Sequence, residues 1–131
     1  MDTPGQRRFL VVEPIAAMRV LFRNLLKEIG YADIEDVDSG QAGLARLRER
    51  PFDCCIVELR MPGIDGLALL REVRADAALK RMPVLLVADQ ATREDVTAAA
   101  QAGASACVVK PFTRAILEDR IASILQKAMA A

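Results

Sequence analysis

Hydrophobic positions along the chain alternate between two periods. Short runs rich in Val, Ile and Leu have the length of buried strands, and each is followed by a stretch in which apolar residues recur every three or four positions, as on an amphipathic helix. The first helical stripe runs from Met18 to Ile29. The predicted strands are residues 9–13, 33–37, 52–58, 83–89 and 106–110.

Capping residues stand at the ends of the predicted helices. Ser39 and Thr113 precede helical patterns as N-caps, and Thr92 with Asp95 forms a capping signal for the fourth helix. Gly30 follows the first helical stripe at the position where a left-handed residue commonly ends a helix. These residues place the helix boundaries between the strands.

Five strands that alternate with five helices predict a single α/β domain. Such repeated βα units form a parallel sheet covered by helices on both faces, a three-layer α/β/α arrangement. The chain has 131 residues, of which 53% are hydrophobic, enough for one core. We expect a polar N-terminal segment over residues 1–7, one domain over 8–127 and a frayed tail over 128–131. Met1 and the short tail favour a stand-alone chain.

Composition excludes several classes of function. Lys and Arg together number 18, as do Asp and Glu, so no net charge attracts nucleic acid or a membrane surface, and we expect neither partner. No histidine is present, which excludes Ser/His/Asp catalysis and histidine-containing zinc sites. Cys54, Cys55 and Cys107 lack metal-binding spacing and are interpreted as small buried hydrophobes in a reducing cytoplasm.

Charged residues end several of the predicted strands. Glu13, Glu58 and Asp89 end the first, third and fourth strands, and Lys110 ends the fifth. Ligands of open parallel sheets bind beyond the carboxyl ends of the strands. The combination is compatible with a cation site, an acid/base pair or an anion pocket, and spacing alone does not choose among them.

Four segments together resemble one family. "FLVVEPIAAMR", "ELRMPGIDGLALL", "MPVLLVADQ" and "AGASACVVKPFT" are similar to the landmarks of CheY-like response-regulator receiver domains, and the resemblance covers residues 8–127. It implies a (βα)5 flavodoxin-like fold and a role in two-component, phosphorelay or chemotaxis signalling, not an enzyme. Receivers of this family bind Mg²⁺ and accept a phosphoryl group from a histidine kinase on an aspartate.

The resemblance also assigns family positions to residues of this chain. The positions concerned are the acidic pair, the phosphoacceptor aspartate, the hydroxyl, the aromatic switch, and the lysine with the proline after it. Glu13 and Pro14 correspond to the acidic pair, and Glu58 to the phosphoacceptor aspartate. Ala88 corresponds to the hydroxyl and Cys107 to the aromatic switch. Lys110 and Pro111 correspond to the lysine and the proline after it.

Most of these positions depart from the family pattern. Pro14 offers no side-chain metal ligand, and the extra methylene of Glu58 displaces its carboxylate, which is costly for a nucleophile. Ala88 lacks a hydroxyl; by analogy with oxyanion donors, each lost contact costs about 2–4 kcal/mol. We therefore predict a degenerate receiver with no catalytic residue and weak or absent Mg²⁺ binding, for which Glu13, Glu58 and the Arg60 carbonyl are only weak candidates.

The first hypothesis is a pseudo-receiver that acts as a signalling adaptor without phosphorylation. Glu58 is expected to pair with Lys110, joined by Glu13 and by Arg60, and so to fix one conformation. Partners would bind the face formed by the fourth helix, fifth strand and fifth helix. The resemblance suggests a histidine kinase, a phosphotransferase or a flagellar or chemotaxis protein as the partner.

Two alternatives remain open from the sequence. The receiver scaffold could sense a small ligand such as a cyclic dinucleotide, whose phosphates arginines can grip in a bidentate manner. The candidate arginines are Arg71, Arg74, Arg114 and Arg120. Alternatively, Glu58 could itself accept a phosphoryl group.

Overall fold

The structure is a computed structural model that describes residues 6–130, and side chains as far as residue 128. A single parallel sheet has the strand order β2-β1-β3-β4-β5. The strands are β1 (Arg8–Val12), β2 (Asp33–Val37), β3 (Cys54–Glu58), β4 (Val84–Ala88) and β5 (Ala106–Val109). The helices are α1 (Ala16–Ile29), α2 (Gly40–Glu49), α3 (Gly66–Ala75), α4 (Arg93–Ala102) and α5 (Arg114–Ala130). The predicted α/β/α flavodoxin-like fold is confirmed.

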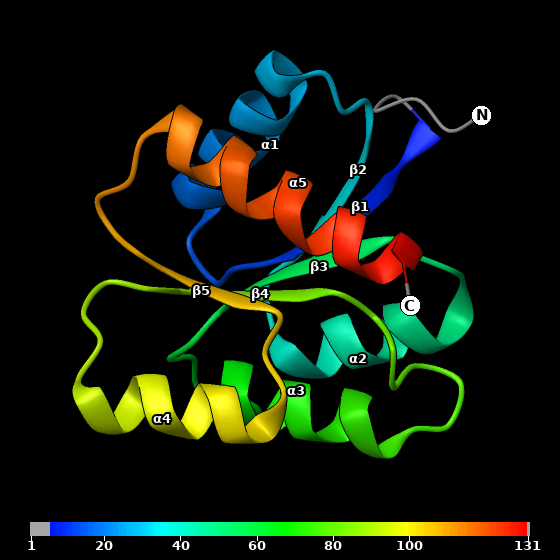
Figure 1. Cartoon of the computed structure of the whole chain (residues 1–131), viewed down its shortest axis with the longest axis vertical. Coiled ribbons are helices and arrows are strands. Elements are labelled where there is room, and N and C mark those ends of the chain that lie inside the picture. The colour runs from blue at the N-terminus through cyan, green and yellow to red at the C-terminus, as the bar shows by residue number, and fades with distance from the viewer. Residues whose placement is uncertain (1–5, 131) are drawn as a thin grey trace.

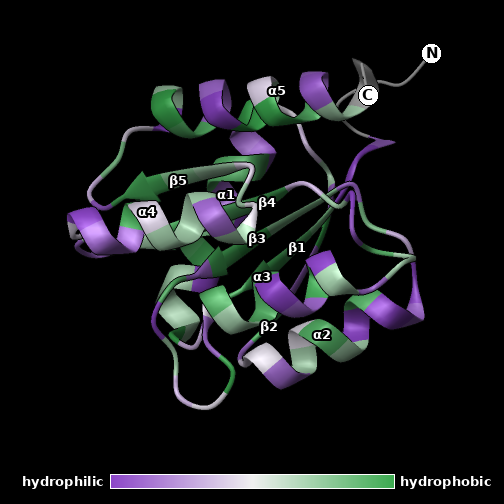
Figure 2. Ribbon diagram, turned by 60° about the horizontal axis from the view of Figure 1, so that its bottom comes forward, coloured by the Kyte–Doolittle hydropathy of each residue, from purple (hydrophilic) through white to green (hydrophobic). Residues whose placement is uncertain are grey.

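Helices cover both faces of the sheet. Figure 1 shows α1 and α5 on one face and α2, α3 and α4 on the other. Successive side chains of a strand point to opposite faces. Phe9 and Val11 of β1 accordingly belong to the core beneath α1 and α5, whereas Leu10 and Val12 belong to the core beneath α2 and α3. The apolar strands between the two helix layers are visible in Figure 2.

The strand register brings the charged strand ends to one edge of the sheet. Val12 of β1 lies beside Val57 of β3, and Glu58 lies beside Val87 of β4. Ala88 in turn lies beside Val109 of β5. Because all strands are parallel, the residues that follow them lie along the same edge of the sheet. The strand order reverses between β1 and β3, which is where ligands of such sheets commonly bind.

The predicted caps are present. The Ser39 side chain accepts a hydrogen bond from the Ala42 amide, and Thr92 and Asp95 form a reciprocal capping box. Gly30 and Gly103 follow α1 and α4 with positive φ. Each cap satisfies backbone groups that the end of a helix leaves without partners.

The two ends of the chain differ in how far they are described. Residues 1–5 of the predicted N-terminal segment and residue 131 lie outside the described residues. The predicted frayed tail from 128 is helical as far as Ala130. Ala, Met, Gln and Lys dominate this last turn, and all four are strong helix formers.

Candidate functional site

Lys110 lies among three carboxylates at the carboxyl ends of the strands. Its Nζ is 3.3 Å from Glu58 Oε2, 3.5 Å from Glu13 Oε1 and 3.5 Å from Asp89 Oδ1. Nζ also donates a hydrogen bond of 3.3 Å to Glu58 Oε1. The Glu58–Lys110 pair with Glu13 therefore has the predicted arrangement, and Asp89 is an additional member.

Glu13 is held rigidly just after β1. The residue is buried, and its amide donates to the Val37 carbonyl. Glu13 Oε2 accepts a hydrogen bond of 2.8 Å from the Ile15 amide, while Oε1 accepts none and lies toward Lys110. The Arg19 guanidinium donates to the backbone carbonyls of Glu13 and Pro14. These contacts fix the loop between β1 and α1.

Glu58 ends β3 as a buried acid. Its Oε2 accepts no hydrogen bond but lies within ion-pair distance of Lys110. The strand end is packed tightly from behind, because a Cβ built on Gly66 would lie 2.4 Å from the Glu58 carbonyl oxygen. Glycine at this position therefore permits the close approach of α3 that positions Glu58.

The electrostatics of Glu58 and Lys110 are coupled. Burial raises the pKa of Glu58, and the nearby Lys110 ammonium opposes that shift. For Lys110, burial acts to lower the pKa, but attraction to Glu58 and Glu13 outweighs it and the pKa is raised. At neutral pH Lys110 is therefore a firmly held cation that compensates buried negative charge.

A cavity lies beside Glu58 at this edge of the sheet. A cavity of about 440 Å³ is lined by six residues: Glu58, Arg60, Ala88, Asp89, Gln90 and Thr92. Ala88 is buried and presents only a methyl group. Cys107, predicted to stand at the aromatic switch position, is half-buried and packs against the core.

The residues present do not fit a Mg²⁺ ion. Pro14 has no side-chain oxygen, Glu13 Oε2 is bound to the Ile15 amide, and Glu58 is paired with Lys110. Within residues 6–128, no group of three Asp, Glu, His or Cys side chains is arranged to hold a metal. Mg²⁺ prefers a near-octahedral set of oxygen ligands, which this arrangement does not offer.

Arg60 does not join the Glu58–Lys110 pair as predicted. Its guanidinium instead donates to the Gln90 carbonyl at 3.0 Å and forms an ion pair with the Asp95 carboxylate. Lys110 already occupies the space beside the buried acids, whereas the partly exposed Asp95 lies within reach of Arg60 at the start of α4.

The four arginines proposed for a nucleotide lie on helices that cover opposite faces of the sheet (Figure 1), Arg71 and Arg74 on α3 and Arg114 and Arg120 on α5. Arg74 donates to the carbonyls of Gly103 and Met82, at 2.9 and 2.6 Å, and also to the Lys80 carbonyl and the Ser105 hydroxyl. Arg120 pairs with its neighbour Asp119. Because its donors are engaged mainly with the backbone, Arg74 serves the fold and is not available to grip a phosphate.

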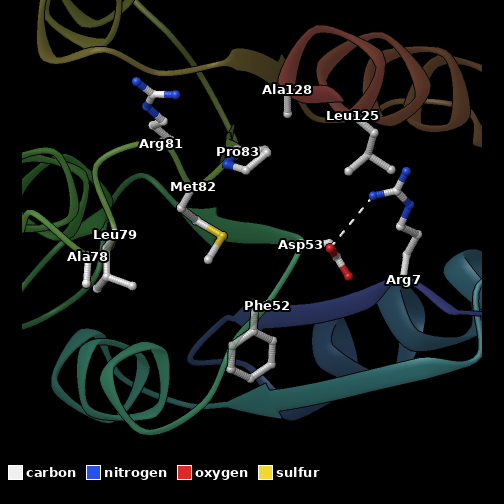
Figure 3. Close-up of a pocket in the computed structure, with 10 residues that line it drawn as sticks. All are labelled: Arg7, Phe52, Asp53, Ala78, Leu79, Arg81, Met82, Pro83, Leu125 and Ala128. Carbon is white, nitrogen blue, oxygen red and sulfur yellow. Dashed lines mark ion pairs between the residues drawn. The ribbon is translucent and has the colours of Figure 1, made fainter. Parts of the chain in front are cut away.

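Asp53 immediately precedes β3, at the end of the strand opposite Glu58. Its carboxylate accepts from the Arg8 amide at 2.8 Å and lies 3.7 Å from Arg7. Figure 3 shows this ion pair in a pocket of about 330 Å³ that also includes Arg81 and Leu125. The pocket is therefore remote from Glu58 and does not supply a replacement acid.

The cysteines are free thiols. Cys54 and Cys55 are buried, and burial raises the pKa of Cys55 to about 12. Burial also raises the pKa of Cys107. The thiols are therefore protonated and act as apolar packing groups. Among the described residues, none of the helices is long and apolar enough to cross a membrane.

Some contacts of the site were not predicted from sequence. Asp89 was recognised only as a strand-end acid, and its approach to Lys110 depends on the β4–α4 loop. The contacts of Arg19 with the Glu13 carbonyl and of Arg60 with Asp95 were also missed. The capping signal at Thr92 was the one local clue, since it placed Asp95 in the first turn of α4.

Comparison with known proteins establishes the family. Residues 9–122 match the response regulator receiver domain, which is most of the chain. The chain belongs to the response regulator receiver domain family. Its type is CheY-like: it is 39% identical over 120 residues to the chemotaxis protein CheY of Pseudomonas aeruginosa, covering 92% of this chain and 97% of that protein.

Further comparisons with proteins and solved structures also find receiver domains. The chain is 37% identical over 120 residues to CheY-3 of Vibrio cholerae, covering 92% of each protein. Its structure resembles the receiver domain of a signal transduction histidine kinase from Syntrophus aciditrophicus, with a TM-score of 0.84, 26% identity and coverage of 92% and 91%. A CheY-like receiver from Methanospirillum hungatei has a TM-score of 0.86 at 23% identity, with coverage of 95% and 97%, and supports the fold.

Proposed function

We propose that this receiver works without phosphorylation, as a protein-binding adaptor held in one conformation by the Glu58–Lys110 pair. The observation that carries the proposal is the buried ion pair itself, with Glu13 as its second acid. A buried pair contributes little net stability, but removing one partner is costly, so the pair resists rearrangement.

The absence of switching groups supports a fixed state. Ala88 has no hydroxyl to contact a phosphoryl oxygen, and Cys107 has no aromatic ring to reorient. Pro14 removes a side-chain oxygen beside Glu13. Together these three residues leave the site without a metal ligand, without a hydroxyl contact to a phosphoryl group and without a reporter ring, although Lys110 remains as a cation.

The face formed by α4, β5 and α5 is the proposed binding surface. Val96, Val109 and Ile116 expose 50%, 44% and 40% of their surface, one from each of these elements. Each of the three elements thus offers an exposed apolar side chain, as protein-binding surfaces commonly do. A histidine kinase, a phosphotransferase or a flagellar or chemotaxis protein is the proposed class of partner.

The test is capture of the partner by the tagged chain, with and without acetyl phosphate and Mg²⁺. We expect the same protein in both conditions, and loss of capture in Val109→Glu. Val20→Glu on α1 is the matched control, because Val20 is equally apolar and 56% exposed on another face. Capture that requires acetyl phosphate, or that survives Val109→Glu and fails in Val20→Glu, would contradict the proposal.

A further inference from the structure

Arg60 links two loops beside the cavity next to Glu58. It lies in the loop after β3, and its guanidinium binds the Gln90 carbonyl in the loop after β4. The same guanidinium pairs with Asp95 in the first turn of α4. Two of its nitrogen atoms are thus engaged with a segment 30 to 35 residues further along the chain.

Asp95 is also part of the α4 capping box. Its Oδ2 accepts from the Thr92 amide at 3.0 Å, and its own amide donates to Thr92 Oγ1 at 3.0 Å. The hydrogen bond from the Thr92 amide and the contact with Arg60 lower the pKa of Asp95. One carboxylate therefore joins the start of the helix to the loop that carries Arg60.

Helix α4 buries fewer apolar side chains than α3. Within the described residues 93–102, Ala99 is the only buried residue of α4. By contrast, α3 buries Leu69, Leu70 and Val73. Elements with few buried apolar contacts open at low free-energy cost, so polar contacts have more influence on where α4 lies.

We propose that Arg60 is a conformational strap, which fixes the first turn of α4 relative to the loop after Glu58. This inference rests on the proposed function, because it adds to the Glu58–Lys110 pair a second contact that holds the α4–β5–α5 face in one position. An isolated exposed ion pair contributes little. Here Arg60 also contacts Gln90, and Asp95 also caps α4, so the contacts together stabilise the first turn of this helix.

Hydrogen exchange of the full chain, followed by mass spectrometry, tests the strap. In Arg60→Gln we expect amide exchange over residues 90–97 to rise about threefold, in the range that loss of an exposed ion pair allows. Asp95→Asn keeps an oxygen for the Thr92 amide but loses the ion pair, and should show a rise no larger than that of Arg60→Gln, since Arg60 still reaches the Gln90 carbonyl. The double variant should show no further rise over Arg60→Gln, because Arg60→Gln has already removed the ion pair.

Arg71→Gln is the matched control, since Arg71 is an exposed arginine on α3. It should leave exchange over residues 90–97 unchanged. An Arg60→Gln variant that exchanges like wild type, or a double variant whose effect equals the product of the single effects, would overturn the strap. Either result would leave the partner-capture test of the proposed function unaffected, so the two failures are distinguishable.

Discussion

The cation of Lys110 compensates two buried carboxylates, Glu13 and Glu58. Neither acid has enough hydrogen bonds of its own: one oxygen of each accepts none within the described residues. Since an ionised carboxylate is costly to bury without a partner, the lysine is required once both acids are charged. Glu58 is therefore one of two buried acids whose charge a single lysine compensates.

Replacing Lys110 with Met should destabilise the protein by about 3 kcal/mol, because it leaves Glu13 and Glu58 buried without a cation. Urea unfolding at neutral pH measures the change. Lys80→Met is the control, since Lys80 is exposed, and it should change the unfolding free energy by less than about 0.5 kcal/mol. Equal stability of the two variants would show that Lys110 does not compensate the acids.

At the scale of elements, α3 lies on the face of the sheet opposite α1 (Figure 1). Its residue Arg74 joins α3 to two other segments. It extends from α3 to the carbonyls of Met82 before β4 and Gly103 after α4. Burial lowers the pKa of its guanidinium, but the group remains charged at neutral pH because the ordinary value is so high. The side chain thus fixes the position of α3 relative to the segments that lead into β4 and β5.

Replacing Arg74 with Met should cost about 2 kcal/mol, because it removes hydrogen bonds from a charged donor and leaves carbonyl groups without partners. Arg71→Met is the control: it makes the same replacement at an exposed site of the same helix, and it should change the unfolding free energy very little. Chemical unfolding of both variants measures the difference. A cost for Arg74→Met no larger than that for Arg71→Met would rule out this role.

Sequence predicted the elements better than the contacts between loops. Strands such as 33–37 and caps such as Ser39 depend on local patterns, so they could be located without a structure. The Glu58–Lys110 pair followed from parallel strand ends. The partner of Arg60 did not, because an arginine side chain can reach several acids and only the path of the β4–α4 loop selects Asp95.

At the scale of the whole molecule, the chain combines the fold of a CheY-like receiver with a cluster of charged side chains at one edge of its sheet. The sheet places Glu13, Glu58 and Lys110 together at the carboxyl ends of the strands. We propose that this cluster supports signalling through a fixed binding surface and not through a phosphorylated acid.

The decisive measurement is the intact mass of the protein after incubation with acetyl phosphate and Mg²⁺. A receiver with aspartate at the position of Glu58, and Glu58→Asp in this chain, are measured in parallel. We predict no added phosphoryl group on the wild type or on Glu58→Asp, because Pro14 and Ala88 still remove needed contacts, while the aspartate-containing receiver gains one. A phosphoryl group on wild-type Glu58 would contradict the proposed function.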